Sequence, residues 1–358
     1  MPISVMLKPA SSACNLRCKY CFYSSIAQSR TDANKGMMTL DTAKCVIKNA
    51  FEFTKGGDVY FTFQGGEPLL RGLEFFEEFT SLCNQLNIYG SKLSICVQTN
   101  GTLIDDEWCR FFKKNNVLVG VSLDGDEELN DYRIYPDGSN SFNDIMQGIE
   151  LLKKYDVAFN VLSVLTKRLA NNVRTSYRFF KQNDLRYLQY IPCLKPFDSE
   201  DNEYSMSNED YAEYLNRCFK IYYNDKMRGN FVSVRQLDNY VLLANGQNAE
   251  QCGMNGPCST QFVVEGDGSV YPCDFYCVDE WCLGNINESD FDALHRSEKS
   301  VEFLKESFKI KDECKTCRYF AICRAGGCKR NRASYDYCSA YKSFFDNSLD
   351  MILNLKGV

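Results

Sequence analysis

Between residues 3 and 195 the chain alternates short apolar runs, rich in β-branched residues, with longer amphipathic segments. This alternation constrains the fold more than any other feature, because repeated strand–helix units require parallel strands joined by crossovers. The expected strands are 4–10, 58–64, 94–100, 117–125, 158–166 and 187–194. We predict an α/β fold, a partial (β/α)6 barrel whose ligands bind at the carboxyl ends of the strands.

Two of the amphipathic segments carry clear helix signals. Residues 141–156 place their apolar side chains on one face, and Ser141 with Asp144 is predicted to cap that helix. Residues 207–225 begin with a predicted capping box of Ser207 and Asp210. One face of this second helix is expected to be core, with Tyr211, Tyr214, Cys218, Phe219 and Tyr222.

Length and charge narrow the class of protein. A chain of 358 residues is long enough for two domains, and its net charge of −6 disfavours nucleic acid or an anionic membrane as the main partner. The first ten residues lack the pattern of a signal peptide, and no run approaches the roughly 18 apolar residues of a membrane span. We therefore expect a cytoplasmic monomer that recognises its substrate in a pocket or groove.

Nineteen cysteines and a single histidine, His295, limit the chemistry. The cysteine count is odd and several lie too close together to pair, so metal binding is favoured over a disulfide framework. One histidine nearly excludes mixed Cys/His zinc sites and histidine-based triads, and His295 is assigned no role. Cysteines crowd beyond residue 235, which predicts a domain at 1–235 and a metal-stapled domain at 236–358.

The segment "CNLRCKYC" contains Cys14, Cys18 and Cys21 directly after the first predicted strand. A structural zinc site needs four protein ligands, whereas three thiolates on a [4Fe-4S] cluster leave one iron open for a cofactor. A zinc knuckle completed by a distant ligand is the alternative. After the second strand, "QGGEP" combines glycines that permit a close backbone approach with Glu67, a carboxylate for an ammonium group.

The cysteine spacing followed by "QGGEP" resembles the signature of the radical S-adenosylmethionine superfamily. The resemblance implies that S-adenosylmethionine binds the open iron and that Gly65, Gly66 and Glu67 hold its methionyl amine. It further implies cofactor contacts by Tyr20, Ser122, Arg133 and Leu194. For each of these residues alone, a turn or packing role is the alternative.

The tail resembles the SPASM extension of this superfamily, which holds two auxiliary [4Fe-4S] clusters. The resemblance assigns the first cluster to Cys252, Cys258, Cys273 and Cys328. It assigns the second to Cys314, Cys317, Cys323 and Cys338. The spacing before Cys328 is one residue longer than in the family, so Cys277 or Cys282 could replace it. Two closed zinc sites are the alternative for this tail.

Four segments, "KPASSACNLRCKYCFY", "FQGGEPLLRGLEFFEEF", "QTNGTLIDDEW" and "QFVVEGDGSVYPCDFY", together with the tail resemble clostridial-type anaerobic sulfatase-maturating enzymes over nearly the whole chain. This resemblance implies oxidation of a cysteine or serine to Cα-formylglycine in a sulfatase Cys/Ser-x-Pro-x-Arg motif. It implies that Asp274 is the catalytic base and that Tyr23 and Gln64 position the substrate. An electron donor such as flavodoxin or ferredoxin is expected.

Other interpretations stay open at this point. For Asp274, the alternative is a carboxylate that accepts backbone N–H bonds in the cluster loop. SPASM enzymes also form thioether or carbon–carbon crosslinks in ribosomally made peptides; many carry an N-terminal leader-binding domain, and only 13 residues precede Cys14 here. A metal-stapled binding module without enzymatic activity is the third possibility.

The six remaining cysteines, at 45, 83, 96, 109, 193 and 218, are expected to be small buried hydrophobes.

Overall fold

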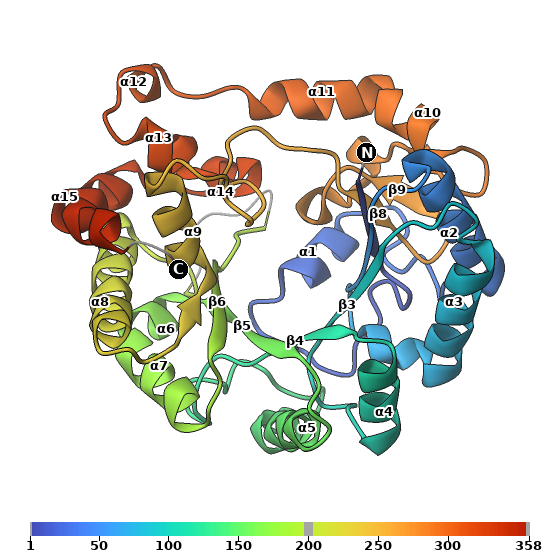
Figure 1. Ribbon diagram of the computed structural model, residues 1–358, viewed down its shortest axis with the longest axis horizontal. Helices are drawn as coiled ribbons and strands as arrows, with labels where there is room; N and C mark the ends of the chain where they lie inside the picture. The colour runs from blue at the N-terminus through green and yellow to red at the C-terminus, as the bar shows by residue number, and fades with distance from the viewer. Residues whose placement is uncertain (1, 197–202, 356–358) are drawn as a thin grey trace. The chain divides into compact units, whose positions relative to one another are not determined.

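The computed structural model describes residues 2–196 and 203–355. These residues form two compact units, each assembled from separate stretches of the chain. The first unit comprises 1–122, 132–159 and 260–303, and the second comprises 123–131, 160–259 and 304–358, apart from the residues not described. Each unit contains strands covered by helices (Figure 1).

All six predicted strands are confirmed, within a few residues at their ends. They are β1 (Ile3–Leu7), β2 (Val59–Phe63), β3 (Leu93–Thr99), β4 (Leu118–Ser122), β5 (Phe159–Leu165) and β6 (Tyr187–Pro192). Four shorter strands were not predicted: β7 (Ser233–Val234), β8 (Phe262–Val264), β9 (Ser269–Tyr271) and β10 (Gly284–Asn285). Strands this short carry too few residues for a period of two to stand out.

The sheet of the first unit has the order β10-β9-β8-β1-β2-β3-β4. Strands β1 to β4 run parallel, and Leu7 of β1 lies beside Phe63 of β2. Strand β8 joins the free side of β1 in parallel, whereas β9 and β10 are antiparallel additions. The segments that follow β1, β2 and β3 therefore emerge at one edge of the sheet, beside the end of β8.

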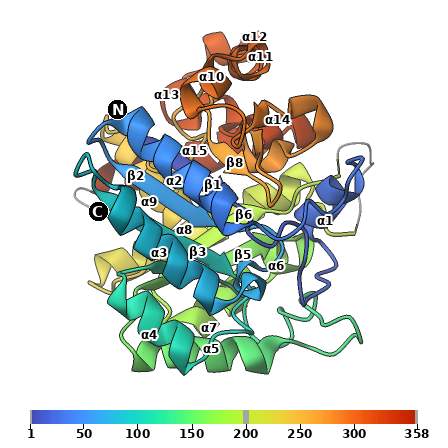
Figure 2. The same ribbon diagram turned by 90° about the vertical axis from the view of Figure 1, so that its right-hand side faces the viewer.

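Five helices of the first unit cover one face of this sheet: α2 (Leu40–Thr54), α3 (Leu73–Leu86), α4 (Asp106–Lys114), α5 (Phe142–Lys154) and α10 (Phe291–Arg296). Helix α1 (Phe22–Gln28) packs on the opposite face, because it contacts Val263, whereas α2 contacts the preceding residue, Phe262. Helix α11 (Glu298–Ser307) follows α10 in the chain. Figure 2 shows α2, α3 and α4 one after another along the sheet. Aromatic packing holds this layer, since Phe63 lies 4.7 Å from Phe76 and Phe76 lies 5.1 Å from Trp108, measured between ring centroids.

The capping pair predicted for α5 is wrong. The Ser141 hydroxyl donates to the Arg133 carbonyl at 2.7 Å, and the Asp144 carboxylate accepts from the Tyr135 hydroxyl at 2.6 Å. Ser141 makes no side-chain cap hydrogen bond. Both side chains instead fasten the loop before the helix, which sequence spacing alone does not reveal.

In the second unit, β5, β6 and β7 run parallel. Its helices are α6 (Lys167–Asn171), α7 (Val173–Gln182), α8 (Asn208–Met227), α9 (Arg235–Ala244), α12 (Asp312–Lys315), α13 (Phe320–Cys323), α14 (Lys329–Ser334) and α15 (Cys338–Asn354). The capping box of Ser207 and Asp210 is confirmed, and so is the predicted core face of α8. Among the described residues, no helix combines the length and hydropathy of a membrane span.

Candidate active site and cluster ligands

The three cysteines of the N-terminal triplet lie in the loop between β1 and α1. Cys14 Sγ accepts hydrogen bonds from the Leu16 backbone N–H at 3.4 Å and from Asn100 Nδ2 at 3.8 Å. Burial raises the pKa of Cys14 to about 11, and the negative charges of Glu67 and Cys21 add to this effect. The charge contribution of Cys21 shows that it lies near Cys14, and three thiols in one loop are the donor set of a [4Fe-4S] cluster with one open iron.

The segment after β2 packs directly on the triplet loop. Gly66 N–H donates to the Ser11 carbonyl, and Glu67 N–H donates to the Ala13 carbonyl, both at 2.8 Å. A Cβ atom on Gly65 would lie 2.9 Å from the Ser11 carbonyl oxygen, and Gly65 has a φ of +130°. The close backbone approach that the glycines permit therefore joins this segment to the triplet loop.

Glu67 is fully buried beneath this loop. Its carboxylate accepts from Leu69 N–H at 3.0 Å, from the Thr99 hydroxyl at 2.8 Å and from Asn100 N–H at 2.7 Å. Burial raises the pKa of Glu67 to about 7, although these three hydrogen bonds favour the ionised form. Because a carboxylate has about four acceptor positions, the group can still accept a hydrogen bond from an ammonium group.

Asn100 links the third strand to the triplet, and sequence analysis assigned it no specific role. Its Nδ2 donates to Asn15 Oδ1 at 2.8 Å, next to Cys14. At the ends of β3 and β4, Gln98 Nε2 donates to the Ser122 hydroxyl at 3.2 Å. The position of Asn100 directly after a parallel strand was the available signal.

Tyr20 and Arg133, both predicted cofactor contacts, lie together. The Arg133 guanidinium is 5.4 Å from the centroid of the Tyr20 ring. The two segments run side by side, because Lys19 N–H donates to the Tyr132 carbonyl at 3.0 Å. Leu194, the remaining predicted contact, is buried and lies two residues after the end of β6 in the second unit.

Asp274 begins a short 3-10 turn, Asp274–Tyr276, after Cys273. Its Oδ1 accepts from Lys8 Nζ at 2.5 Å, and its Oδ2 accepts from Gln64 Nε2 at 2.8 Å. Lys8 directly follows β1 and Gln64 directly follows β2, so adjacent parallel strands deliver both donors to the carboxylate. Lys8 was not predicted as a site residue; the available signal was a lysine at the end of an apolar strand.

The ring of Tyr23 packs against the ammonium group of Lys8. Lys8 Nζ is 3.6 Å from the centroid of the Tyr23 ring, and the Tyr23 hydroxyl donates to the Glu265 carboxylate. Arg30 Nη1 donates to the same carboxylate at 2.8 Å. The structure thus brings Tyr23, Gln64 and Asp274 to one place, with Lys8 between Tyr23 and Asp274.

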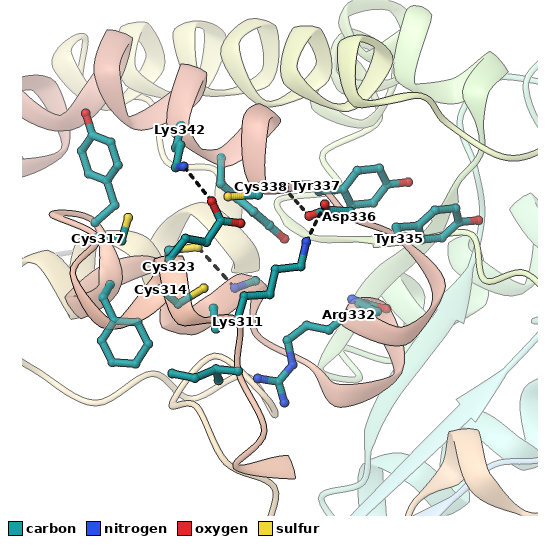
Figure 3. Close-up of a pocket in the computed structure, with 18 of the residues that line it drawn as sticks. Lys311, Cys314, Cys317, Cys323, Arg332, Tyr335, Asp336, Tyr337, Cys338 and Lys342 are labelled. Carbon is teal, nitrogen blue, oxygen red and sulfur yellow. Dashed lines mark hydrogen bonds and ion pairs between the residues drawn. The ribbon is translucent and has the colours of Figure 1, made fainter. Parts of the chain in front are cut away.

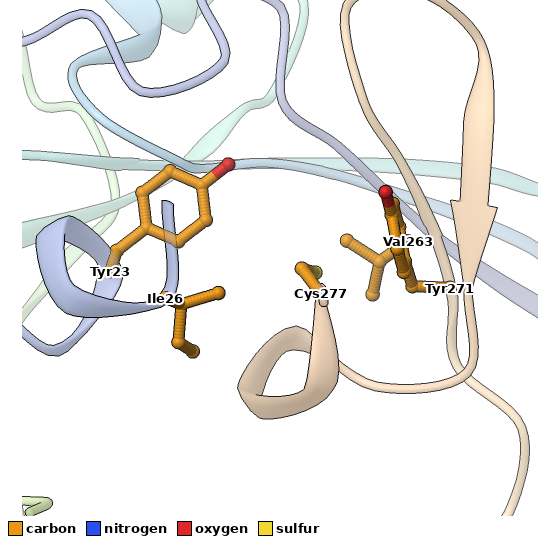
Figure 4. Packing of buried hydrophobic residues seen from close by; sticks show 5 residues of the cluster. All are labelled: Tyr23, Ile26, Val263, Tyr271 and Cys277. Carbon is orange, nitrogen blue, oxygen red and sulfur yellow. The ribbon is translucent and has the colours of Figure 1, made fainter. Parts of the chain in front are cut away.

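Cys277 and Cys282, the two cysteines that could replace Cys328 as a cluster ligand, lie in environments that differ from those of the predicted ligands. Cys277 is fully buried in an apolar cluster with Tyr23, Ile26, Val263 and Tyr271 (Figure 4). Its thiol donates to the Cys273 carbonyl at 3.6 Å, and burial raises its pKa far above the ordinary value. The Cys282 thiol contacts the Gly284 carbonyl at 3.6 Å.

Three other cysteines lie together in the second unit. A Cβ atom on Gly253 would lie 2.8 Å from the Cα atom of Cys328, so the two backbones touch. Burial raises the pKa of Cys252 to about 11, with further contributions from Cys328 and Cys258. Cys273, the fourth ligand expected from the family, belongs to the first unit.

The last four predicted ligands line one cavity of about 310 Å³ in the second unit. Figure 3 shows Cys314, Cys317, Cys323 and Cys338 around it. Burial, together with the neighbouring thiols, raises the pKa of Cys323 to about 12. Among the described residues, no three His, Cys, Asp or Glu side chains are arranged around a single metal ion. Four thiols around a cavity are the donor set of a [4Fe-4S] cluster.

Two family comparisons cover most of the chain. Residues 9–172 match the radical SAM superfamily, and residues 257–318 match the SPASM iron–sulfur cluster-binding domain. These matches confirm the predicted fold class and the cofactors, S-adenosylmethionine and [4Fe-4S] clusters.

Several known relatives are similar in sequence to this chain over nearly its whole length. A cysteine-type anaerobic sulfatase-maturating enzyme from Clostridium perfringens is 42% identical, covering 99% of this chain and 98% of that protein. A serine-type enzyme from Bacteroides thetaiotaomicron is 32% identical, covering 93% and 84%. The solved structure of native anSMEcpe with bound AdoMet and Cp18Cys peptide has a TM-score of 0.94 at 41% identity, covering 99% of each chain. The chain belongs to the anaerobic sulfatase-maturating enzymes of the radical SAM superfamily.

Proposed function

We propose that this enzyme oxidises a cysteine within a sulfatase Cys-x-Pro-x-Arg motif to Cα-formylglycine. The observation that carries the proposal is the Asp274 carboxylate, held by Lys8 and Gln64 beside the end of β1, the strand from which the triplet loop departs. Cysteine is favoured over serine because the cysteine-type relative is 42% identical and the serine-type relative 32%.

Cys14, Cys18 and Cys21 would hold the cluster that binds S-adenosylmethionine. Glu67 would accept a hydrogen bond from the cofactor's ammonium group, and further contacts to the cofactor would come from Tyr20, Ser122, Arg133 and Leu194. Bound there, the cofactor supplies a 5′-deoxyadenosyl radical that removes one hydrogen atom from the substrate Cβ. The protein's part is to orient the two reactants and to exclude water.

Asp274 would receive the proton. Conversion of CH2–SH and water to an aldehyde and hydrogen sulfide releases two hydrogens: one leaves as an atom, and the other as a proton and an electron. A general base must lie within hydrogen-bond reach of that proton, and Asp274 has a carboxylate fixed by two donors. Gln64 and Tyr23 would hold the substrate peptide in register with it.

The auxiliary clusters, when bound, supply the acceptor for the electron. We propose Cys252, Cys258, Cys273 and Cys328 as ligands of the first and Cys314, Cys317, Cys323 and Cys338 as ligands of the second. The grouping of Cys328 with Cys252 and Cys258 supports this choice over Cys277, which is enclosed by apolar side chains. The domains would be 1–235 and 236–358.

A low-potential protein such as flavodoxin or ferredoxin would be the electron donor, and the enzyme would act as a monomer. We place it in the cytoplasm because the ligands must persist as reduced thiolates, which a reducing compartment maintains.

Anaerobic incubation with S-adenosylmethionine, a reductant and a Cys-x-Pro-x-Arg peptide tests the proposal. Formylglycine with one 5′-deoxyadenosine per turnover supports it, and a matched Ser-x-Pro-x-Arg peptide should react more slowly. Cofactor cleavage with a peptide crosslink would instead identify a crosslinking enzyme. About a dozen irons per chain, expected for three cubane clusters, would exclude a zinc-stapled binding module.

A further inference from the structure

We infer that Lys8 is the positioning residue for the catalytic base, holding the Asp274 carboxylate in the orientation that receives the substrate proton. The inference rests on the proposed function. Lys8 is fully buried, and its Nζ donates to Asp274 Oδ1 at 2.5 Å. Among the described residues, the Lys8 ammonium donates a hydrogen bond to Asp274, so we expect Lys8 to act on the reaction through that carboxylate.

A buried lysine is costly unless its charge is compensated. Burial alone would lower the pKa of Lys8, but the negative charges of Asp274 and Glu265 raise it above its ordinary value. The face of the Tyr23 ring adds a cation–π contact at 3.6 Å. Lys8 is therefore held as an ammonium by its surroundings.

Two donors on two oxygens define the plane of the Asp274 carboxylate. Lys8 contacts Oδ1 and Gln64 contacts Oδ2. The Lys8 backbone is itself fixed, because its N–H donates to the Val264 carbonyl at 2.8 Å. Asp274 belongs only to a three-residue turn, so its orientation is set by the ends of β1 and β2. Loss of Lys8 would leave the carboxylate free to rotate about its contact with Gln64.

The residues behind Lys8 support the same arrangement. The Tyr23 hydroxyl and Arg30 both donate to Glu265, which fixes the ring on which the ammonium rests. Lys8 thus lies between a clamped aromatic ring and the base. A Tyr23→Phe variant, which keeps the ring face, should retain far more activity than Tyr23→Leu.

The test compares Lys8→Met with Lys181→Met. Lys181 also contacts an aspartate, Asp225, at 2.5 Å, but this pair belongs to the second unit, whereas Asp274 belongs to the first. Iron content, thermal stability, peptide Kd and the steady-state constants are measured for each variant. With a peptide deuterated at the cysteine Cβ, deuterium in 5′-deoxyadenosine reports hydrogen abstraction separately from product formation.

If Lys8 positions the base, Lys8→Met should lower kcat for formylglycine formation about 100-fold, because a misplaced catalytic group costs about that much. KM and the peptide Kd should stay near those of the unaltered enzyme. Deuterium transfer should persist, so formylglycine per 5′-deoxyadenosine falls. Lys8→Arg, which keeps a cation and donors, should recover part of the yield, and Lys181→Met should match the unaltered enzyme.

Unchanged product yield in an iron-replete Lys8→Met protein would overturn the inference. So would a loss confined to peptide Kd, because Lys8 would then bind substrate. If Lys8→Met does not fold, Lys8→Arg decides: a reduced yield at normal KM supports positioning, and a weaker peptide Kd at normal kcat opposes it. Failure of the proposed function is separate, since it appears as absence of formylglycine from the unaltered enzyme.

Discussion

Gly66 lies so close to Ala13 that a Cβ atom on Gly66 would be 2.0 Å from the Ala13 carbonyl oxygen. Two backbone hydrogen bonds join the same segments, from Gly66 to Ser11 and from Glu67 to Ala13. Ala13 precedes the first cysteine of the triplet. The "GGE" segment therefore supports the loop that carries the three cysteines.

Gly66→Ala should displace this loop and lower the occupancy of the N-terminal cluster. The expected loss is about four irons of a dozen, with the auxiliary clusters retained. Iron analysis and electron paramagnetic resonance measure it. The control is Gly72→Ala: Gly72 has a φ of +86° and nothing within 4 Å of its added Cβ, so backbone strain of about 1–2 kcal/mol is the only expected cost. Equal cluster loss in both variants would contradict the steric argument.

The raised pKa of Glu67 predicts that cofactor binding depends on pH. Its folded-state pKa of about 7 is raised from the ordinary value by burial, so the carboxyl is mainly protonated below pH 7 and ionised above it. An ammonium ligand prefers the carboxylate, so Kd for S-adenosylmethionine should rise about tenfold per pH unit as pH falls below 7. Titration calorimetry on the anaerobic enzyme measures this dependence.

Glu67→Gln removes the ionisable group and keeps the shape, so its cofactor Kd should be weaker and nearly constant between pH 5.5 and pH 8, a range chosen to bracket about 7. The same raised pKa affects stability in the cofactor-free enzyme. The unfolded chain ionises first as pH rises, so the free energy of unfolding should fall between the ordinary pKa and about pH 7 and then level. A pH dependence retained by Glu67→Gln would assign it to another group.

The fourth ligand of the first auxiliary cluster can be identified by iron content. Cys328→Ala should lose about four irons, because Cys328 lies with Cys252 and Cys258. Cys277→Ala and Cys282→Ala should keep all clusters, although Cys277→Ala should lower stability by removing a buried group. Full iron in Cys328→Ala together with a loss in Cys277→Ala would reverse the assignment.

The cavity of about 310 Å³ should lose its cluster when Cys338 becomes alanine. The iron content should again fall by about four, and formylglycine yield should fall because one electron acceptor is missing. Cys45→Ala is the control, since Cys45 lies in α2 and is not a predicted ligand. Retention of iron in Cys338→Ala would show that another residue completes the set.

Sequence alone determined the features that depend on nearby residues. Six strands were predicted because apolar runs bounded by turns are local signals, and the triplet and "GGE" motifs were identified because their spacing is contiguous. The capping box of Ser207 and Asp210 was confirmed for the same reason. Local spacing also gave one wrong prediction. Ser141 and Asp144 have the spacing of a helix cap, but their side chains bind the loop before α5.

Only the tertiary structure decided which distant residues meet. Lys8 and Asp274 are separated by 266 positions in the chain, and they meet because β8 pairs with β1, and β9, which precedes Asp274, pairs with β8. Likewise, the spacing of the cysteines could not decide whether Cys277 or Cys328 is the fourth ligand. In the structure, Cys277 lies among apolar side chains and Cys328 lies beside Cys252. Such pairings follow from strand register and packing, which join segments that share no local sequence signal.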